Sequence, residues 1–375
     1  MKKIVIACDS FKESMSATVA CQAIEKGIKD GYHQNIETIL LPLADGGEGS
    51  AKVIGEAMHL PIVSVDTCNP YLEKMKADYY FDNDKKLAII EVASSCGIDL
   101  IDKEKRNPTK ALSYGFGTMI KDAIKRGSQE IVLCLGGSVT NDGGYGMLQA
   151  LGAVFYDQNK QELPLTIDAI EKVKSIDISK IQELLGACKL NVASDVTNYF
   201  VGAKGATYTF GPQKGATQSQ LEYLEHSLLS FNEAIKSSLQ IDLSTIEKTG
   251  SAGGIGGALY CIGATLCSGI DLILELVNFK EVIKDTDYIF TGEGSIDGQT
   301  IQGKTISGVA KMAKLQQIPV IALAGRVTSE ASNLYDIGVT AMFSITNEAK
   351  ELKQALLDGE ISLIETTRNI IKLIK

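Results

Sequence analysis

The stretch Lys3–Asp9, KIVIACD, is a short apolar run that ends at an acid, and the same pattern returns along the chain. Such runs alternate with longer amphipathic segments, which is typical of an α/β fold with mainly parallel sheets. We expect strands at Lys3–Cys8, Glu37–Leu41, Ile62–Val65, Lys86–Val92, Glu130–Leu135, Leu190–Ala193, Asp287–Thr291, Pro319–Leu323 and Ala341–Ser344. We expect helices at Ala17–Asp30, Gly49–Met58, Thr109–Lys125, Gly144–Leu151, Gln220–Ser237, Lys304–Lys314 and Asn347–Leu373. Met75–Phe81 and Lys86–Val92 predict an antiparallel hairpin.

A chain of 375 residues is long enough for about two to three domains. The pattern changes near Thr67–Pro70, and the strand at Asp287 can return to the first domain. We therefore predict a discontinuous three-layer α/β domain over residues 1–67 and 288–375. Residues 68–287 are expected to form a second, dissimilar α/β domain with Gly-rich loops.

The charge balance and the cysteine pattern limit the class of protein. The 46 acidic residues outnumber the 37 basic ones, and the net charge of −9 argues against a nucleic-acid partner, whose phosphates need Lys and Arg. The uncharged stretch Thr249–Ile270 is rich in Gly and is interpreted as a loop and a buried helix, not as a membrane span. The eight cysteines include no C-x-x-C pair, and the apolar run before Asp9 is shorter than that of a signal peptide. We expect a cytoplasmic protein that binds no membrane.

Acids follow the carboxyl ends of several expected strands, where ligands bind in open α/β sheets. They are Asp9, Asp45, Asp142, Asp195 and Glu293. Each alone is also a common cap or turn residue, but together they would repel one another without a cation. Mg²⁺ binds carboxylate and phosphate oxygens, and Glu293 and Asp297, which share one Gly-rich segment, are the candidate metal ligands.

Glycines beside these acids allow backbone N–H groups to approach phosphate oxygens closely. Candidate phosphate-binding loops are Gly46–Gly47, Gly136–Ser138, Gly143–Gly144 and Gly250–Gly254, and Lys12, Lys204, Lys214 and Lys304 lie in or beside such loops. Acids for a metal, glycines for phosphate and lysines for charge together predict phosphoryl transfer.

Two alternatives remain open at this point. Gly298–Thr305 matches the P-loop pattern G-x-x-x-x-G-K-T, which would make the protein a P-loop-type small-molecule kinase centred on Lys304. Its context is poor, because the preceding strand is expected to end near Thr291 and few residues follow. A two-domain solute-binding protein would also place Gly-rich strand ends around a ligand.

Long blocks in one order resemble the bacterial glycerate kinase family. They are DSFKESMSA (Asp9–Ala17), PLADGGEGS (Pro42–Ser50), RNPTKALSYGFG (Arg106–Gly117), GGSVTNDGGYGMLQALGA (Gly136–Ala153), SDVTNYFVGAKGATYTFGPQKGAT (Ser194–Thr217), GSAGGIGGAL (Gly250–Leu259) and TGEGSIDGQTIQGKT (Thr291–Thr305). Two positions depart from the family pattern: Ser295 stands where Arg is usual, and Cys8 where Pro is common. The family's lysine falls on Lys304, so the resemblance explains the P-loop match as coincidence.

The resemblance implies Mg²⁺-assisted phosphorylation of D-glycerate by ATP, on two dissimilar α/β domains with the site in the cleft between them. The implied product is 2-phosphoglycerate, with 3-phosphoglycerate as the alternative. Asp195, a lone acid after a buried strand, is our candidate for the base that accepts the hydroxyl proton, with Lys12 as the second catalytic residue. The expected substrate- and phosphate-binding residues are Ser10, Asp45, Gly46, Gly47, Ser138, Asn141, Asp142, Lys214, Gly253, Gly254 and Lys304. A monomer or small homo-oligomer is expected.

Overall fold

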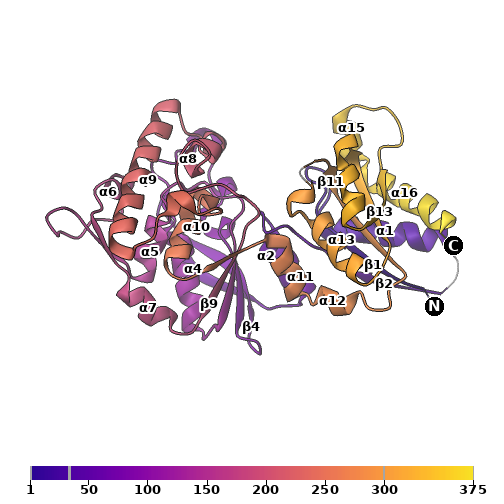
Figure 1. Cartoon of the computed structure of the whole chain (residues 1–375), viewed down its shortest axis with the longest axis horizontal. Coiled ribbons are helices and arrows are strands. Elements are labelled where there is room, and N and C mark those ends of the chain that lie inside the picture. The colour runs from indigo at the N-terminus through magenta and orange to yellow at the C-terminus, as the bar shows by residue number, and fades with distance from the viewer. Residues whose placement is uncertain (1, 33–34, 299, 375) are drawn as a thin grey trace. The chain divides into compact units, whose positions relative to one another are not determined.

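The structure, a computed structural model, describes residues 2–32, 35–298 and 300–374 and divides into two compact units (Figure 1). The first unit joins Met1–Asp45, Lys52–Met58 and Ser268–Lys375 and is therefore discontinuous. The second unit comprises Gly46–Ala51 and His59–Cys267. Both are α/β units with mainly parallel sheets, as the sequence predicts.

The unit boundaries differ from those expected at 67 and 288. Strand β3 (Ile62–Cys68) was assigned to the first domain, but it pairs along its length with β4 (Lys74–Asp82) in the sheet of the second unit. Helices α11 (Gly269–Leu276) and α12 (Phe279–Val282), expected in the second domain, belong to the first unit. Which strand β3 pairs with depends on contacts between parts of the fold, and a local change in the sequence pattern does not determine it.

The first unit is built on a five-stranded parallel sheet in the order β13-β12-β11-β1-β2. The strands are β1 (Lys2–Cys8), β2 (Ile36–Leu40), β11 (Tyr288–Ile296), β12 (Val320–Val327) and β13 (Val339–Ser344). Residues Ile4 to Cys8 pair in register with Tyr288 to Gly292, and β2 pairs with the other side of β1, so the apolar run of the opening stretch lies on an interior strand of the sheet. All five of these β1 residues are fully buried, as expected for a strand covered on both faces.

Helices cover both faces of this sheet. On one face Ile321 and Leu323 pack with residues of α1 (Ala17–Gly31) and α16 (Gly359–Leu373). On the other face Ala322 and Ala324 pack with residues of α13 (Thr305–Leu315) and α14 (Asn333–Ile337). The alternation along β12 follows from the two-residue period of a strand.

The expected C-terminal helix Asn347–Leu373 is interrupted. The structure has a short α15 (Leu352–Leu357) and then α16, with Asp358 between them. A Cβ on Gly359 would lie 2.2 Å from Ser14 Oγ, so a glycine is needed where the second helix begins. The prediction of one continuous helix from Asn347 was wrong: residues 347–351 are not helical, and Asp358 caps both the end of α15 and the start of α16.

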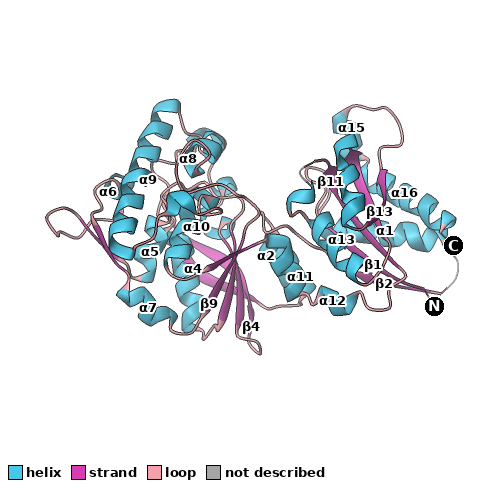
Figure 2. Ribbon diagram, in the orientation of Figure 1, coloured by secondary structure: helices cyan, strands magenta, loops and turns pink. Residues whose placement is uncertain are grey.

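The second unit contains a six-stranded sheet in the order β10-β9-β6-β5-β4-β3 (Figure 2). Four strands run parallel to one another: β5 (Leu87–Glu91), β6 (Glu130–Cys134), β9 (Lys189–Ala193) and β10 (Thr265–Cys267). Strand β4 runs antiparallel to both of its neighbours, β5 and β3. The β4–β5 pair is the predicted hairpin. A separate two-stranded sheet joins β7 (Val154–Tyr156) and β8 (Ser175–Asp177).

The helices of the second unit form a core with the sheet that includes Phe116, Tyr145 and Phe231. They are α3 (Ala93–Cys96), α4 (Tyr114–Lys125), α5 (Tyr145–Leu151), α6 (Ile167–Ile170), α7 (Ser179–Leu185), α8 (Ala206–Phe210), α9 (Gln218–Leu239) and α10 (Ser251–Cys261), and α2 (Ser50–Ala57) lies where the chain passes between units. The Tyr145 ring stacks on Phe155 with centroids 4.4 Å apart. This packing fixes the start of α5, directly after the loop that carries Asp142.

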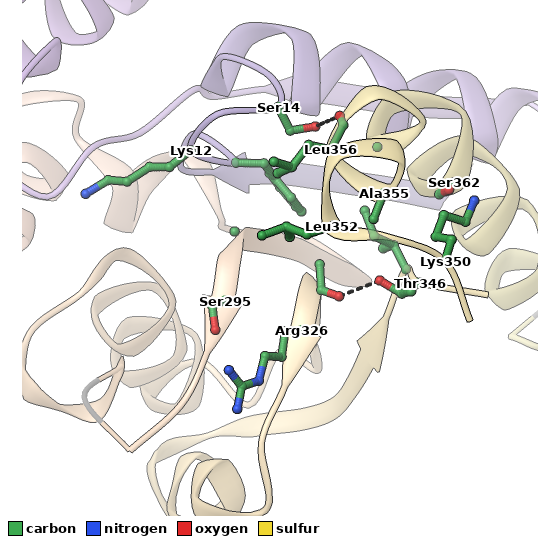
Figure 3. Close-up of a pocket in the computed structure, with 15 residues that line it drawn as sticks. Lys12, Ser14, Ser295, Arg326, Thr346, Lys350, Leu352, Ala355, Leu356 and Ser362 are labelled. Carbon is green, nitrogen blue, oxygen red and sulfur yellow. Dashed lines mark hydrogen bonds between the residues drawn. The ribbon is translucent and has the colours of Figure 1, made fainter. Parts of the chain in front are cut away.

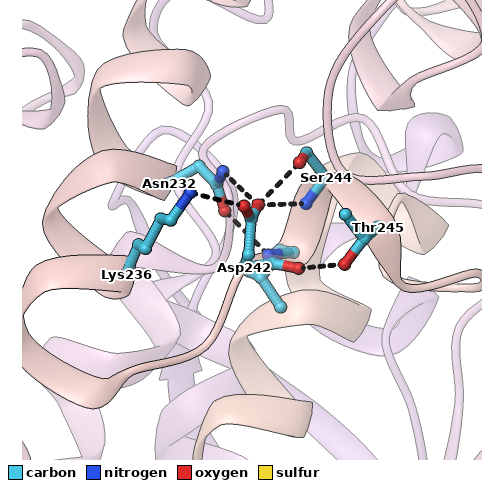
Figure 4. A network of polar contacts seen from close by, with 6 residues as sticks. Asn232, Lys236, Asp242, Ser244 and Thr245 are labelled. Carbon is cyan, nitrogen blue, oxygen red and sulfur yellow. Dashed lines mark hydrogen bonds and ion pairs between the residues drawn. The ribbon is translucent and has the colours of Figure 1, made fainter.

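A polar network fixes the connection from α9 to α10 (Figure 4). The Asp242 carboxylate accepts hydrogen bonds from Lys236 Nζ at 2.8 Å, Asn232 Nδ2 at 3.1 Å and Ser244 Oγ at 2.6 Å. The Lys236 ammonium, together with the Ser244 and Asn232 donors, lowers the pKa of Asp242. The network orders the segment that leads into the Gly-rich start of α10.

The uncharged stretch 249–270 contains the buried helix α10, as predicted. It also contains the short strand β10 and the start of α11, which the sequence did not predict. The first residues of α10, Ala252 to Gly254, have positive φ angles and form a turn. Across the described part of the chain, no helix has both the length and the apolar character needed to span a membrane.

Candidate active site

Two acids flank the point where the strand order of the first unit reverses. The chain proceeds from β1 to β2 in one direction, and from β11 to β12 and β13 in the other. Ligands of open α/β sheets bind at such a switch point, beyond the carboxyl ends of the strands. Asp9 follows β1, and Glu293 lies near the end of β11. The sequence predicted Glu293 after a strand ending at Thr291, but β11 continues to Ile296, which holds this carboxylate on rigid backbone.

Asp9 is half-buried and is held by hydroxyl and amide donors. Thr305 Oγ1 donates to Asp9 Oδ2 at 2.7 Å, and the backbone N–H and Oγ of Ser10 donate to Oδ1 at 2.6 and 3.2 Å. Burial raises the pKa of Asp9, and the neighbouring Asp45 carboxylate raises it further. The Ser10 hydroxyl, expected to bind substrate, therefore contacts Asp9 in this structure.

Glu293 is 6% exposed and accepts a hydrogen bond from Thr300 Oγ1 at 2.7 Å. Lys304 Nζ lies 3.9 Å from its Oε2 atom. Burial raises the pKa of Glu293 to about 7, opposed by Lys304 and Thr300 and reinforced by Asp9 and Asp297. The structure thus brings together the predicted Asp45, Glu293, Asp297 and Lys304, with Asp9 among them.

Because burial raises the pKa of Glu293, the free energy of unfolding should depend on pH through the titration of this carboxyl. Between its ordinary pKa of 4.5 and about 7, the folded protein holds a proton that the unfolded chain has lost. The contribution of the protonated Glu293 carboxyl to the stability of the fold is complete below pH 4.5, and it is lost as pH rises through about 7. We expect Glu293→Gln, which does not titrate, to gain up to about 3 kcal/mol in unfolding free energy relative to wild type between about pH 5 and about pH 8. Parallel pH profiles of Tm for the two proteins would contradict this.

In the second unit, the carboxyl ends of β5, β6 and β9 lie at one edge, because these strands are parallel neighbours. Glu91, the last residue of β5, was not predicted. It accepts hydrogen bonds from the backbone N–H groups of Gly49 at 2.6 Å and Ala51 at 3.1 Å. Burial raises the pKa of Glu91. The loop with Gly46 and Gly47 is therefore fixed by a carboxylate, which uses some of the N–H groups that a phosphate would need.

Asp142 anchors its own loop. Its Oδ2 accepts from the Ser113 N–H at 2.8 Å, Ser113 Oγ at 2.7 Å and the Gly146 N–H at 3.0 Å, and its Oδ1 accepts from the Gly144 N–H at 3.1 Å. The side chain is fully buried, and burial raises its pKa. These contacts show that Asp142 anchors its loop, and the expected contact of Asp142 with substrate stays a prediction.

The glycines at 253 and 254 have a packing role of the same kind. A Cβ on Gly253 would lie 2.0 Å from the Thr140 carbonyl oxygen, and one on Gly254 would lie 2.7 Å from Gly143 Cα. The Gly143 N–H donates to the Gly253 carbonyl at 3.0 Å, so the expected phosphate-binding turn at Gly143–Gly144 has its N–H groups occupied. The two glycine-rich turns are thus packed against each other.

Lys214 and Ser138 form a buried polar pair beside this loop. Lys214 Nζ donates to the Thr140 carbonyl at 2.7 Å and to Ser138 Oγ at 3.3 Å. Burial lowers the pKa of Lys214 to about 7, and the Asp142 carboxylate opposes that shift. Asn141 donates from Nδ2 to Thr207 Oγ1 at 3.0 Å, while its buried Oδ1 has no hydrogen-bond donor among the described residues. Asn141 Oδ1 is therefore a buried acceptor that the described residues leave without a donor.

Asp195 follows β9 at the same edge and is half-buried. The preceding residue is fixed: the Ser194 N–H donates to the Cys267 carbonyl at 3.4 Å, and Lys248 Nζ donates to the Ser194 carbonyl at 3.1 Å. Because Cys134 pairs with Ala193, Asp195 emerges next to the segment that leads to Ser138. Its role as a base stays a prediction.

Lys12 and the Lys304 segment complete the predicted set. Lys12 is exposed, and its backbone nitrogen lies so close to Gly294 that a Cβ there would be 3.3 Å away. Lys304 precedes α13, and it and Thr305 contact the acids Glu293 and Asp9. The strand before the P-loop-like segment ends at Ile296, later than expected, and Gln299 of that segment lies outside the described residues.

Sequence reasoning found acids at strand ends but missed their hydroxyl partners. Ser113, Thr300 and Thr305 hold Asp142, Glu293 and Asp9. Thr300 is seven residues from its acid, whereas Ser113 and Thr305 are 29 and 296 residues from theirs, and no local pattern marks such distant donors. Glu91 was accessible to the same strand-end rule, since it ends the apolar run LAIIE. Within residues 2–32, 35–298 and 300–374, no three His, Cys, Asp or Glu side chains form a preassembled metal site.

The sequence and the structure of this chain are similar to those of known proteins. The model described as the Glycerate kinase family matches residues 4–375. A glycerate kinase of Halalkalibacterium halodurans is 41% identical over 371 residues, covering 99% of this chain and 97% of that protein. A glycerate 2-kinase of Escherichia coli is 39% identical and covers 98% of this chain and 97% of its own. A crystal structure assigned to glycerate kinase 2 of Salmonella typhimurium LT2 superposes with a TM-score of 0.87 at 38% identity, covering 100% of this chain and 98% of that one.

Proposed function

The chain belongs to the glycerate kinase family, and from that premise we propose that it transfers the terminal phosphoryl group of ATP to the 2-hydroxyl of D-glycerate. The bond between the γ-phosphorus and its bridging oxygen breaks, a bond to the glycerate oxygen forms, and ADP leaves. The observation that carries the proposal is the group of mutually repelling acids with Lys304 at the β1/β11 switch point, in which Glu293 is buried and Asp9 is half-buried. Such a group suits a reaction that brings phosphate and a cation together.

The choice of the 2-hydroxyl is supported by the relative named glycerate 2-kinase. Transfer to the 3-hydroxyl remains the alternative product, because no described contact orients one hydroxyl against the other. The P-loop alternative has less support, since Lys304 and Thr305 contact the carboxylates of Glu293 and Asp9.

Mg²⁺ bound together with ATP would neutralise charge on the transferring phosphoryl group. Glu293 and Asp297 would hold it, with phosphate oxygens as further ligands, since Mg²⁺ is commonly bound by one or two carboxylates plus substrate phosphates. The raised pKa of Glu293 and Asp9 fits this role, because a bound cation would offset burial and repulsion in their ionised forms.

The remaining residues take roles that their chemistry allows. Asp195 accepts the proton that the glycerate hydroxyl loses. Lys12 and Lys304 contact phosphate oxygens, and Asn141 Oδ1, which lacks a donor among the described residues, accepts from a substrate hydroxyl. Lys214 positions the Asn141 loop by donating to the Thr140 carbonyl, and it also donates to Ser138 Oγ. A cytoplasmic location and a monomeric or small oligomeric state complete the proposal.

The test is ATP consumption measured with D-glycerate and without it, in the presence of Mg²⁺. We expect ADP formation that depends on glycerate. A protein that binds glycerate but never consumes ATP would favour the solute-binding alternative, and that result would contradict the proposal.

A further inference from the structure

A cavity of about 280 Å³ lies in the first unit at the carboxyl ends of β1, β11, β12 and β13 (Figure 3). Helix α15 forms one wall, with Leu352, Ala355 and Leu356 facing the space, and Phe11 lines it from the segment after β1. No role has been given above to this space or to most of its lining residues.

Two glycines on neighbouring strands form part of the lining. Gly294 of β11 and Gly325 of β12 lie where the pairing ladder skips from Glu293↔Ala324 to Ser295↔Arg326. A Cβ on Gly325 would lie 2.9 Å from the Gly294 carbonyl oxygen. Glycine inside a strand often marks close approach of a ligand or another backbone. Here it leaves a wall of backbone without side chains, against which a flat ring can lie.

The cavity has a polar end and an apolar end. Lys12 and Arg326 extend at one end, and neither has a carboxylate within ion-pair distance among the described residues. Lys350, at the other end, is neutralised by Glu348 at 3.0 Å and Asp358 at 3.1 Å. The cationic charge without a carboxylate partner is therefore confined to the end that adjoins Gly294 and Glu293.

We propose that this cavity binds the adenosine part of ATP and ADP. The base lies on the Gly294–Gly325 wall against Leu352 and Leu356, and the phosphates extend toward Arg326 and Lys12. The inference rests on the proposed kinase function for the identity of the nucleotide. Glycerate does not suit the cavity, because a small, fully polar acid gains nothing from an apolar lining, whereas a mostly apolar pocket with a few polar groups suits a nucleoside.

Calorimetric titration with ADP and with adenosine, followed in matched variants, tests the assignment. Ala355→Phe fills the apolar end and should raise the Kd of both ligands by at least about tenfold. Arg326→Gln removes a phosphate contact and should raise the Kd of ADP by about tenfold while adenosine binding stays within about twofold. Leu357→Phe is the control: this residue is on the same helix, is 71% exposed and does not line the cavity. Its Kd values should match wild type.

Unchanged ADP binding in both Ala355→Phe and Arg326→Gln, or no ADP binding to wild type, would overturn the inference. Arg326 is exposed, so its variant remains informative even if Ala355→Phe fails to fold. A failure of the cavity assignment can be distinguished from a failure of the proposed function. Glycerate-dependent ATP consumption with an unchanged KM for ATP in both variants rejects the cavity alone. ADP binding that the variants weaken, without any glycerate turnover in wild type, rejects the function alone.

Discussion

Asp195→Asn should lower kcat for glycerate phosphorylation by about 10²–10⁴ while KM for glycerate stays within about threefold. Asn keeps the size and most hydrogen bonds of Asp but cannot accept a proton. Asp195 follows a buried strand at the edge where Ser138 and Asn141 also lie, and the flanking Ser194 is held by Lys248. The loss should therefore appear in turnover, with the fold intact.

The contrast with a structural acid makes this result interpretable. Asp242→Asn breaks the ion pair with Lys236 and weakens the bonds from Ser244, so it should lower Tm with kcat nearly unchanged. If Asp195→Asn behaves in the same way, with lower Tm and kcat within about threefold, then Asp195 is a turn residue. The base would then be sought among Asp45, Asp142 and Glu293.

Lys12→Met should lower kcat/KM by about 10²–10³, through both a higher KM and a lower kcat. The cation is expected to contact phosphate oxygens before and during transfer, so both constants respond. Lys12 is exposed and has no ion-pair partner among the described residues, so Tm should not change. Lys12→Arg, which keeps the charge, should recover part of the loss.

Lys311→Met is the matched control for Lys12, because Lys311 is also an exposed lysine of the first unit, on α13. It should leave kcat and KM within about twofold of wild type. Equal effects of the Lys12 and Lys311 variants would indicate that Lys12 acts only through the overall charge of the protein.

Most buried strands could be predicted because their apolar character is visible in a few consecutive residues. Buried parallel strands are continuous apolar runs, so β1, β6 and β9 start and end within about two residues of the prediction. The end of β11 was missed because Glu293, Gly294 and Ser295 are poor strand residues that the neighbouring β12 pairs nevertheless. The close packing of Gly359, the first residue of α16, on Ser14 is likewise a contact between residues far apart in the sequence.

The charged residues of the candidate site could be predicted from the sequence, because acids at the ends of apolar runs are visible there. Acids at strand ends located Asp9, Asp45 and Glu293, which the structure brings together. Glycine-rich turns were ambiguous, because a glycine that admits a phosphate and one that admits another backbone look alike in sequence. Gly253 is of the second kind in this structure, since a Cβ there would lie 2.0 Å from the Thr140 carbonyl oxygen, and only the three-dimensional contacts make that distinction.

The central claim is that a phosphoryl group passes from ATP to the 2-hydroxyl of D-glycerate. Phosphorus NMR of the reaction of ATP, Mg²⁺ and D-glycerate with the purified protein observes the product directly, without coupling enzymes. We predict a new phosphomonoester signal coupled to a single methine proton, as 2-phosphoglycerate requires. A signal split by two methylene protons would identify 3-phosphoglycerate and contradict the assigned position, and the absence of any phosphoglycerate signal would contradict the function itself.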